Sequence, residues 1–419
     1  LDLARWEIQT RMKQNRVHGL GLDDSKMEYA HQYKRGYFVD WRVCDKVKQE
    51  LYPSIDYIID TNTENDPKML TGKDFQQALK EVAQQPFRVV PYFDPGPWGG
   101  QWMKKVCDLD QSKENFAWCF DCVPEENSLI LRVNDIDFES PAINLVFNQA
   151  TRLLGSAVES RFGKEFPIRF DFLDTMDGGN LSFQVHPTTQ YIRDHFGMHY
   201  TQDESYYILD AENDGIVYLG LKDDINPDKM IAELRAAQEG KSDFDAAKHV
   251  NIWSAKKHDH FLIPGGTVHC SGKNAMVLEI SSTPYIFTFK MWDWNRLGMD
   301  GKPRPINIDH AEKVINWDRK TDFTKNELVS PCEDIAFGDG WREEKTGLHA
   351  LEFIETRRHW FSKPVMHQTE GSVNVLNLVE GREALVTSPS DQFTPFVVHY
   401  AETFIIPEAV KEYQISPYG

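Results

Sequence analysis

The chain has 419 residues, of which 41% are hydrophobic and 12% aromatic, so it is long enough for two or three domains with apolar cores. Its formal net charge of −19 argues against nucleic acid and against an anionic membrane surface as partners, because both require clustered Lys and Arg. No apolar run approaches the roughly 20 residues of a membrane span. The six scattered cysteines indicate free thiols in a reducing compartment, so we expect a cytoplasmic protein.

Residues 1–85 are predicted to form a mainly helical, charged segment. Aromatic and branched side chains between Tyr29 and Leu51 recur at helical spacing, and residues 70–83 have the pattern of a short helix. The segment contains no phosphate-binding loop. Residues 35–42 faintly resemble the end of a uridine-kinase-like domain, so we interpret the segment as a candidate remnant of a kinase-like domain.

From residue 86 onward the pattern of residue types changes. Short runs of β-branched and aromatic residues alternate with Gly, Pro, Asn and Asp, which predicts an antiparallel sandwich or barrel. The clearest strand candidates are residues 128–133, 206–209, 215–220 and 276–280. Two helical segments interrupt these strands, at residues 142–161 and 228–247, and Asn226-Pro227 is a suitable start for the second. Residues 331–419 return to short strands, which predicts a second, smaller all-β unit.

A set of candidate metal ligands lies in the β region. Gln184 and His186 are two residues apart in a predicted strand, so their side chains share one face and can reach one ion together. The turn that begins at Pro264 contains two glycines and directs His269 at a fixed point. Glu204, just before a strand, is the best-placed acidic ligand. Two His, one Glu and one amide oxygen suit Zn(II), Mn(II), Fe(II) or Co(II).

Three other motifs have plainer interpretations. Cys119 and Cys122 lack the second cysteine pair of a zinc site. His258 and His260 have metal-ligand spacing, but they precede the proline turn, where a solvated hairpin is expected. The tryptophans at 292 and 294 are more typical of a core than of a sugar platform. A strand histidine such as His186 can itself be merely packed, so the metal interpretation depends on the whole set.

The segments that carry this set resemble the class I mannose-6-phosphate isomerases, a two-cupin family. Residues 181–187 resemble the Leu-Ser-x-Gln-x-His-Pro strand of that family, residues 204–211 its Glu-x-Trp-Tyr-Ile segment, and residues 261–269 its Pro-Ala-Gly-Thr-x-His turn. The likeness runs from about residue 86 to 419, and further matching segments are residues 91–100, 277–280, 292–304 and 379–407.

The resemblance implies a mainly β fold of two cupin (jelly-roll) units with helical insertions, preceded by the helical segment. Residues 86–330 would form the metal-binding catalytic cupin, and residues 331–419 the C-terminal cupin. It also implies one divalent metal, with Zn(II) as first choice and Mn, Fe or Co as alternatives. The expected partner is a small phosphorylated sugar, bound by a monomer or homodimer. The implied reaction interconverts mannose 6-phosphate and fructose 6-phosphate by proton transfer between C1 and C2.

The resemblance also assigns roles to individual residues. Glu279 matches a family carboxylate and is the candidate base, and Lys290 takes the place of a catalytic arginine. Ser182 matches a phosphate-contacting serine. Gln202 stands where the family has Lys, and Arg169 can supply a substrate-binding cation from a nearby strand. These substitutions leave open an alternative function, a catalytically silent cupin that binds a sugar phosphate as a sensor or scaffold.

Overall fold

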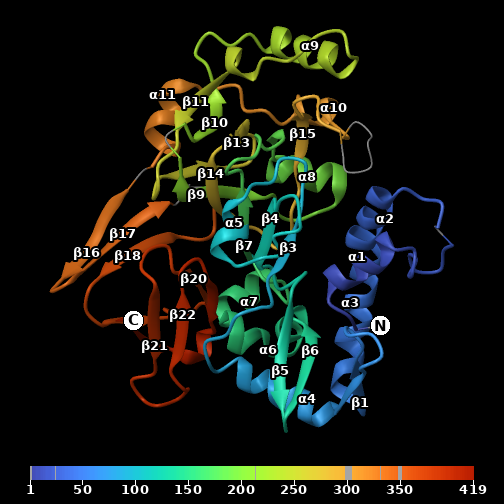
Figure 1. The fold of residues 1–419 in the computed structure, drawn as a ribbon, viewed down its shortest axis with the longest axis vertical. Coiled ribbons are helices and arrows are strands. Elements are labelled where there is room, and N and C mark those ends of the chain that lie inside the picture. Colours follow the sequence, from blue (N-terminus) through green and yellow to red (C-terminus); the bar gives the residue numbers. More distant parts are fainter. Residues whose placement is uncertain (1, 24, 213, 298–303, 331, 348–351) are drawn as a thin grey trace. The chain divides into compact units, whose positions relative to one another are not determined.

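The chain folds into two compact units, described one at a time below. The computed structural model describes residues 2–23, 25–212, 214–297, 304–330, 332–347 and 352–419 (Figure 1). The first unit contains residues 1–92, 121–166 and 364–419, and the second contains residues 93–120 and 167–363. Each unit is thus assembled from segments that are distant in the sequence, whereas the consecutive domains 1–85, 86–330 and 331–419 remain a prediction.

The second unit is built around two antiparallel sheets, as expected for a cupin. The five-stranded sheet has the order β11-β10-β13-β8-β15 and the six-stranded sheet the order β12-β9-β14-β7-β4-β3. Their bounds are β3 (Tyr92–Asp94), β4 (Trp118–Cys122), β7 (Ile168–Asp174), β8 (Phe183–Val185), β9 (Asp203–Ala211), β10 (Ile216–Leu221), β11 (Val250–Ser254), β12 (His260–Ile263), β13 (His269–Ser271), β14 (Ala275–Ser282) and β15 (Phe289–Trp292). The strands predicted at 206–209, 215–220 and 276–280 are therefore confirmed.

An apolar core lies between the strands of this unit. Phe183, Ile208, Val277 and Phe289 are members, each 4% exposed or less, and strands of both sheets contribute to it. Trp292 is 5% exposed and belongs to this core, and Trp294 packs against it, as the sequence indicated. The burial of this apolar surface is the main force that holds the sandwich together.

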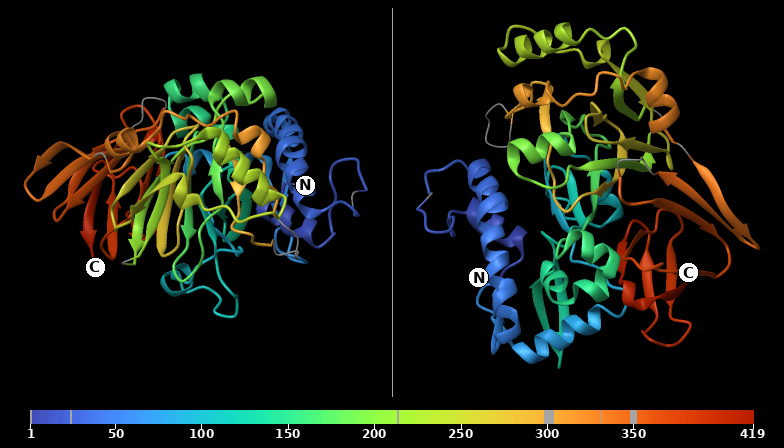
Figure 2. Two further views of the ribbon diagram at one scale, coloured as in Figure 1. Left: turned by 90° about the horizontal axis from the view of Figure 1, so that it is seen from above. Right: turned by 180° about the vertical axis from the view of Figure 1, so that it is seen from behind.

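Helices and a small third sheet complete the second unit. The three-stranded sheet β16-β17-β18 extends beyond the two larger sheets (Figures 1 and 2). The remaining bounds are β16 (Glu333–Gly338), β17 (Trp341–Gly347), β18 (Thr356–Phe361), α5 (Trp102–Val106), α8 (Thr189–Phe196), α9 (Pro227–Gln238), η3 (Ala246–Lys248), α10 (Ile308–Ala311), α11 (Thr321–Phe323) and η4 (Thr324–Leu328).

Helix α9 begins where the sequence predicted and ends earlier. The Asn226 side chain caps it by accepting a 3.0 Å hydrogen bond from the Lys229 N–H, and Pro227 occupies its first turn. The predicted helix continued to residue 247, but the observed helix ends at Gln238. Gly240 follows with a φ of +71°, a left-handed conformation that stops the helix.

His260 lies in a different environment from the one that the sequence indicated. Instead of a solvated hairpin, it starts β12 and is fully buried, and its Nδ1 donates a 3.1 Å hydrogen bond to the Thr346 carbonyl. His258 stays in the preceding turn, half-buried, with its Nδ1 2.9 Å from the Tyr207 hydroxyl. His260 pairs with Tyr207 of β9, and residues Thr346 and Gly347 of β17 cover its ring.

Buried His260 is expected to make the protein less stable in acid. Burial lowers its pKa to about 4, whereas an unfolded histidine titrates near 6.5. Between these values the unfolded chain binds a proton that the native protein does not, so stability falls as pH falls. From pH 7 to pH 5 the loss is about 2 kcal/mol. Urea unfolding at both pH values should show this loss reduced in His260→Gln, and an unchanged loss would contradict the assignment.

The first unit begins with helices and a hairpin. The bounds are α1 (Arg5–Lys13), α2 (Tyr29–Arg35), η1 (Gly36–Asp40), α3 (Trp41–Leu51), η2 (Tyr52–Ser54), β1 (Tyr57–Asp60), β2 (Lys68–Thr71) and α4 (Gly72–Val82). The helical character of residues 1–85 is thus confirmed. The hairpin β1–β2 was not predicted, and its second strand takes the residues expected to open the helix at residue 70. The Thr71 hydroxyl caps α4 by accepting a 3.1 Å bond from the Asp74 N–H.

Charged side chains bind the N-terminal helices to the loop before β5. Arg5 is 4% exposed and forms ion pairs with Asp45 of α3 and with Glu125, the latter at 2.9 Å. The Tyr37 hydroxyl donates a 3.2 Å bond to the other oxygen of Glu125. Arg42 also pairs with Glu125 at 2.5 Å. Residues 1–84 are therefore part of the packing of this unit.

The middle segment of the first unit supplies a hairpin and two helices. These are β5 (Ser128–Val133), as predicted, β6 (Ile136–Pro141), α6 (Ile143–Leu154) and α7 (Ser156–Phe162). The single helix predicted for residues 142–161 is divided at Gly155, which has a φ of +86°. A Cβ there would lie 2.2 Å from the Gly371 carbonyl oxygen, so only glycine fits. Helices α4 and α6 pack side by side (Figure 1).

The C-terminal segment forms the second, smaller β-sandwich. A four-stranded sheet has the order β19-β24-β21-β22, and β20 pairs with β23. The bounds are β19 (Val365–Gln368), β20 (Asn374–Asn377), β21 (Glu383–Thr387), β22 (Phe396–His399), β23 (Thr403–Ile406), η5 (Glu408–Val410) and β24 (Glu412–Tyr418). Phe87 pairs with Ile405, which joins this segment to the N-terminal part of the same unit.

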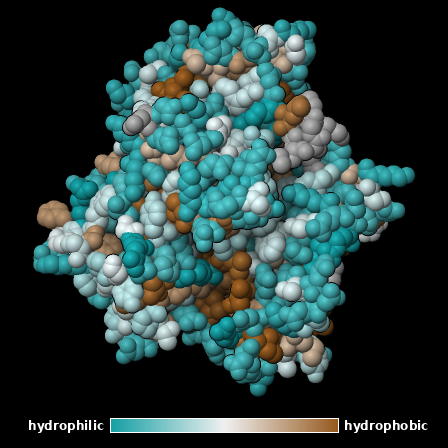
Figure 3. All heavy atoms as spheres, viewed as in Figure 1, coloured by the Kyte–Doolittle hydropathy of each residue, from teal (hydrophilic) through white to brown (hydrophobic). Residues whose placement is uncertain are grey.

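The surface reflects the acidic composition. The face in Figure 3 is mostly hydrophilic, with separate apolar patches. Among the described helices, none is both long and apolar enough to cross a membrane.

Candidate metal centre and active site

Polar side chains form two rows on one face of the six-stranded sheet. Residues that lie directly opposite each other on antiparallel strands share a face. Taken from β9 through β14 to β7, the rows are Glu204, Ser281 and Arg169, and then Tyr206, Glu279 and Asp171. The next row along the same strands is apolar and consists of Ile208, Val277 and Leu173. Along these strands, two polar rows that can form a site are therefore followed directly by an apolar row that belongs to the core.

The five-stranded sheet contributes a third polar row. Gln184 of β8 lies between His269 of β13 and Lys290 of β15 in the strand register. Ser182 and His186 flank Gln184 at two-residue spacing, so they are directed to the same side as Gln184. The site residues that we predicted on these strands therefore share one face of the sheet.

His186, Glu204 and His269 converge on one point. One ligand atom of each lies within 4.8 Å of the others. Glu204 Oε1 is 2.7 Å from His269 Nε2 and 3.1 Å from His186 Nε2, and all three side chains are at most 1% exposed. The amide nitrogen of Gln184 is 3.3 Å from His269 Nε2, and a half-turn of this amide would direct its oxygen to the same place. The four predicted ligands are therefore brought together.

Hydrogen bonds fix both histidines with their Nε2 lone pairs directed inward. His186 Nδ1 donates to the Phe287 carbonyl at 2.8 Å, and His269 Nδ1 donates to the Thr267 carbonyl at 2.9 Å. Among the residues that the structure describes, His186 Nε2 and Glu204 Oε1 are buried without a hydrogen-bond partner. Two imidazole Nε2 atoms and one carboxylate converge here, and the Nδ1 atoms of both rings are held by backbone carbonyls. This arrangement fits a divalent cation.

Glu204 lies between the two histidines, and this position sets the direction of its pKa shift. Burial alone would raise the pKa of Glu204, but the adjacent His186 and His269 outweigh burial and hold that pKa below its ordinary value. Burial opposes protonation of His186, yet Glu204 raises the pKa of this imidazole overall. The site therefore favours a bound positive charge beside an ionised Glu204.

The turn that directs His269 is held by polar contacts and by glycine geometry. The Gly266 N–H donates to the His186 carbonyl at 2.8 Å, and its φ is +89°. A Cβ at Gly265 would lie 2.7 Å from the Pro187 carbonyl oxygen. The Gly265 N–H donates to Asp203 at 2.6 Å, and the Arg319 guanidinium binds the Pro264 and Gly265 carbonyls at 2.6 and 2.8 Å. These bonds connect the two histidine-bearing strands.

Glu279 lies beside this centre, in the second polar row. Its Oε1 accepts hydrogen bonds from the Gln202 amide at 3.0 Å and from the Ser281 hydroxyl at 2.9 Å. Burial is the main cause that raises its pKa well above the ordinary value, and the carboxylates of Glu204 and Asp171 add to it. The sequence placed Glu279 near the metal ligands, and the structure brings it into hydrogen-bond contact with a neighbour of Glu204.

Asp293 joins Ser182 to two arginines at the other end of the β8 face. The Ser182 hydroxyl donates to Asp293 at 2.9 Å and lies 3.4 Å from Arg304 Nη1. Asp293 also pairs with Arg304 at 2.9 Å and with Arg296 at 2.6 Å. We did not select Asp293, Arg296 or Arg304 from the sequence as site residues. The signal was available, because both arginines lie in segments that resemble the isomerase family.

The remaining predicted residues lie close by. Arg169 is 1% exposed, and its Nη2 is 3.6 Å from Asp171 Oδ2, so its charge is balanced within the sheet. Arg169 lies in the same row as Glu204, but β14 separates their strands. The backbones of the two residues are therefore about 10 Å apart. Lys290 is partly buried and lies next to Gln184.

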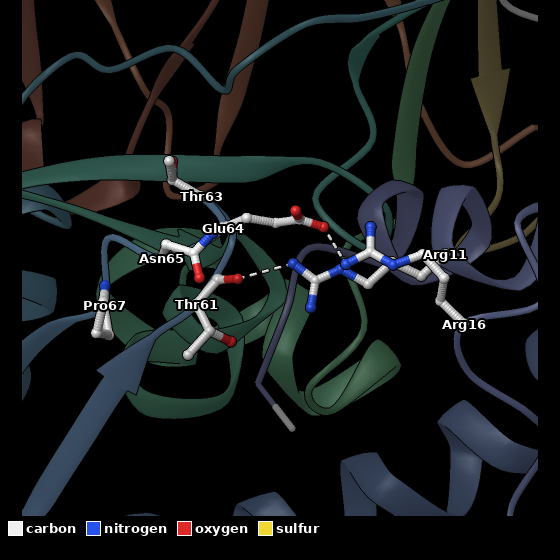
Figure 4. A pocket seen from close by; sticks show the side chains of 7 residues that line it. All are labelled: Arg11, Arg16, Thr61, Thr63, Glu64, Asn65 and Pro67. Atoms are coloured by element: carbon white, nitrogen blue, oxygen red, sulfur yellow. Dashed lines mark hydrogen bonds and ion pairs between the residues drawn. The ribbon is translucent and has the colours of Figure 1, made fainter.

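A hollow outside this site lies in the N-terminal segment. Figure 4 shows it lined by Arg11, Arg16, Thr61, Thr63, Glu64, Asn65 and Pro67. Its arginines are already engaged, since Arg11 donates to the Thr61 carbonyl at 2.7 Å and Arg16 pairs with Glu64. None of the predicted site residues lines this hollow.

Known proteins resemble this chain in sequence and in fold. The probable mannose-6-phosphate isomerase GmuF of Bacillus subtilis is 30% identical over 154 residues, which are 36% of this chain and 45% of the relative. The mannose-6-phosphate isomerase of Streptococcus mutans is 25% identical over 229 residues, 54% of this chain and 66% of the relative. The chain thus spans about half to two thirds of the length of these relatives.

The crystal structure of the mannose 6-phosphate isomerase from Bacillus subtilis has the same fold, with a TM-score of 0.65 at 17% identity. The match covers 80% of this chain and 97% of that one. Residues 1–84 match a family model described as a domain of unknown function (DUF8485). The fold and the His–Glu–His cluster define a two-cupin protein with a candidate metal centre. Within that class, the chain is similar in sequence to mannose-6-phosphate isomerases and shares their fold.

Proposed function

We propose that this protein is a metal-dependent aldose–ketose isomerase that interconverts mannose 6-phosphate and fructose 6-phosphate. The observation that carries the proposal is the convergence of His186, Glu204 and His269 on one buried point with Glu279 in the adjacent row. The named activities of the relatives support the same reaction class. The expected cofactor is one divalent ion, with Zn(II) as first choice and Mn, Fe or Co as alternatives.

The proposed chemistry needs a positive centre and a base. An ion held by the two histidines, Glu204 and Gln184 would stabilise negative charge on the sugar oxygens. Glu279 would take the proton from C2 of the aldose and return it to C1, while the hydroxyl proton of O2 moves to O1, and the two transfers together yield the ketose. Its raised pKa makes the deprotonated carboxylate a stronger base than an exposed glutamate. Lys290, next to Gln184 in the strand register, would stabilise charge on an oxygen during this transfer.

The phosphate would bind at the other end of the β8 face. Ser182 and Arg304 are 3.4 Å apart there, and Arg296 lies on the same Asp293 carboxylate. Two guanidinium groups and a hydroxyl are suitable donors for phosphate oxygens. Ser182 is two residues from Gln184 on the same strand, about 7 Å along the backbone, so one small sugar phosphate can span both ends.

A second candidate is a silent cupin that binds a sugar phosphate as a sensor or scaffold. The neutral Gln202 supports it, because this residue stands where the family has a lysine that could assist proton transfer. Both candidates require the same phosphorylated-sugar ligand, so binding alone does not separate them.

Turnover separates the two functions. Purified protein with stoichiometric Zn(II) or Mn(II) and mannose 6-phosphate should produce fructose 6-phosphate, detected by a coupled assay. Glu279→Gln should lower kcat about 10²- to 10⁴-fold, because it removes the base and keeps the shape. The matched variant Glu333→Gln, exposed on β16, should leave kcat unchanged. Absence of turnover by the metal-loaded native protein would favour the silent cupin.

A further inference from the structure

Gln202 makes several hydrogen bonds within the site. It is 4% exposed and directly precedes β9. Its Nε2 lies 3.0 Å from Glu204 Oε2, 3.0 Å from Glu279 Oε1 and 3.3 Å from Ser281 Oγ. An amide nitrogen has two hydrogens. Both donors are therefore used within the protein, and neither remains for a sugar hydroxyl.

The oxygen of the same amide is also engaged. Gln202 Oε1 accepts a 3.0 Å hydrogen bond from the Phe287 N–H. The carbonyl of Phe287 in turn receives the Nδ1 proton of His186 at 2.8 Å. Gln202 thus contacts Glu204 and Glu279 directly and is linked to His186 through the backbone of one residue, Phe287. These are two of the metal-ligand candidates and the candidate base.

We propose that Gln202 is a positioning residue that holds Glu204 and Glu279 in fixed mutual geometry, and that it does not contact the substrate. This replaces the substrate-binding role expected for it from the sequence. The part that concerns Glu279 rests on the proposed function, whereas the part that concerns Glu204 and His186 requires only the metal centre.

An amide suits this position for a physical reason. Two carboxylates that face each other in a buried site repel, and a donor between them gives both a partner. A lysine ammonium can supply such donors but has no acceptor for the Phe287 N–H. Gln202 supplies both functions without adding a charge next to the metal ligands. The change from lysine to glutamine therefore reorganises the hydrogen bonds of the site.

Metal titration without substrate is the primary test. Gln202→Leu removes the donors and the acceptor while approximately keeping the volume, and we expect its affinity for Zn(II) or Mn(II) to fall 10- to 100-fold. Gln32→Leu is the matched control: Gln32 is 2% exposed and donates to the Met27 carbonyl at 2.9 Å, far from the site in the sequence. Its metal affinity should equal that of the native protein.

Steady-state kinetics with saturating metal give the second readout. A positioning role predicts that Gln202→Leu lowers kcat at least 10-fold and changes KM for mannose 6-phosphate less than about threefold. Ser182→Ala, a candidate phosphate contact, should show the reverse pattern, a raised KM with native metal affinity. If the leucine variant does not fold, Gln202→Met carries the same comparison.

Two results would overturn the proposal. Native metal affinity in the Gln202 variant would remove the link to Glu204 and His186. A raised KM with unchanged kcat would make Gln202 a substrate contact. The metal titration does not depend on turnover of mannose 6-phosphate. It therefore tests the role of Gln202 at the metal centre even if the native protein is not an isomerase, and the two failures can be told apart.

Discussion

His269→Ala is expected to lose stoichiometric divalent metal. His269 is fully buried, its Nε2 lies 2.7 Å from Glu204, and its Nδ1 is fixed by Thr267, so no other described side chain can replace its nitrogen. Loss of an outer-shell partner already weakens metal binding 10- to 100-fold, and loss of a ligand should exceed about 100-fold. Competition with a chromophoric chelator measures the affinity directly. With the ion absent, isomerase activity should fall about 10³-fold or more.

His399→Ala is the control for this variant, because His399 is exposed and lies in the other compact unit. Its metal content and activity should match those of the native protein. Retention of one tightly bound ion per chain by a folded His269→Ala protein would refute the ligand set of His186, Glu204 and His269. Circular dichroism establishes that both variants fold.

Phe75→Ala is expected to destabilise the first unit by about 3–5 kcal/mol. Phe75 of α4 is fully buried, with its ring centroid 6.0 Å from those of Tyr52 and Phe138. Removing the ring leaves a cavity where the N-terminal segment packs on the β5–β6 hairpin. Urea unfolding, followed by circular dichroism, measures the effect.

Tyr57→Ala, in the same N-terminal segment, provides the comparison because Tyr57 is 63% exposed. Its effect should stay within about 0.5 kcal/mol. Equal, small effects of Phe75→Ala and Tyr57→Ala would mean that residues 1–84 are not integral to the fold. A large effect confined to Phe75→Ala establishes that the segment is structural.

The metal ligands were accessible from sequence because their geometry is local. Two-residue spacing on a strand places Gln184 and His186 on one face, and the glycine turn before His269 directs that residue. The role of Gln202 was not accessible in the same way. Its four contacts come from β9, β14 and the Phe287 peptide, and only the register of distant strands brings these together. The Asp293 cluster was missed although Arg296 and Arg304 lie in segments that resemble the isomerase family.

The fold shows the same distinction between local and distant information. Asn226 and Pro227 identified the start of α9, because caps act within one turn. The hairpin β1–β2 was hidden by its length, since each strand has only four residues and one of them continues directly into α4. The bridge between Phe87 and Ile405 has no local signal, because 318 residues separate its partners in the chain (405 − 87 = 318).

The bridge between Phe87 and Ile405 also has a consequence for biosynthesis. The ribosome makes residues 1–92 first, yet their unit is completed by residues 364–419, after the whole second unit has been translated. Domains ordinarily fold in the order of synthesis. Here Phe87 can form its strand pairing only after Ile405 has been synthesised. The second unit consists of residues 93–120 and 167–363, so its whole sequence is available for folding before this pairing can form.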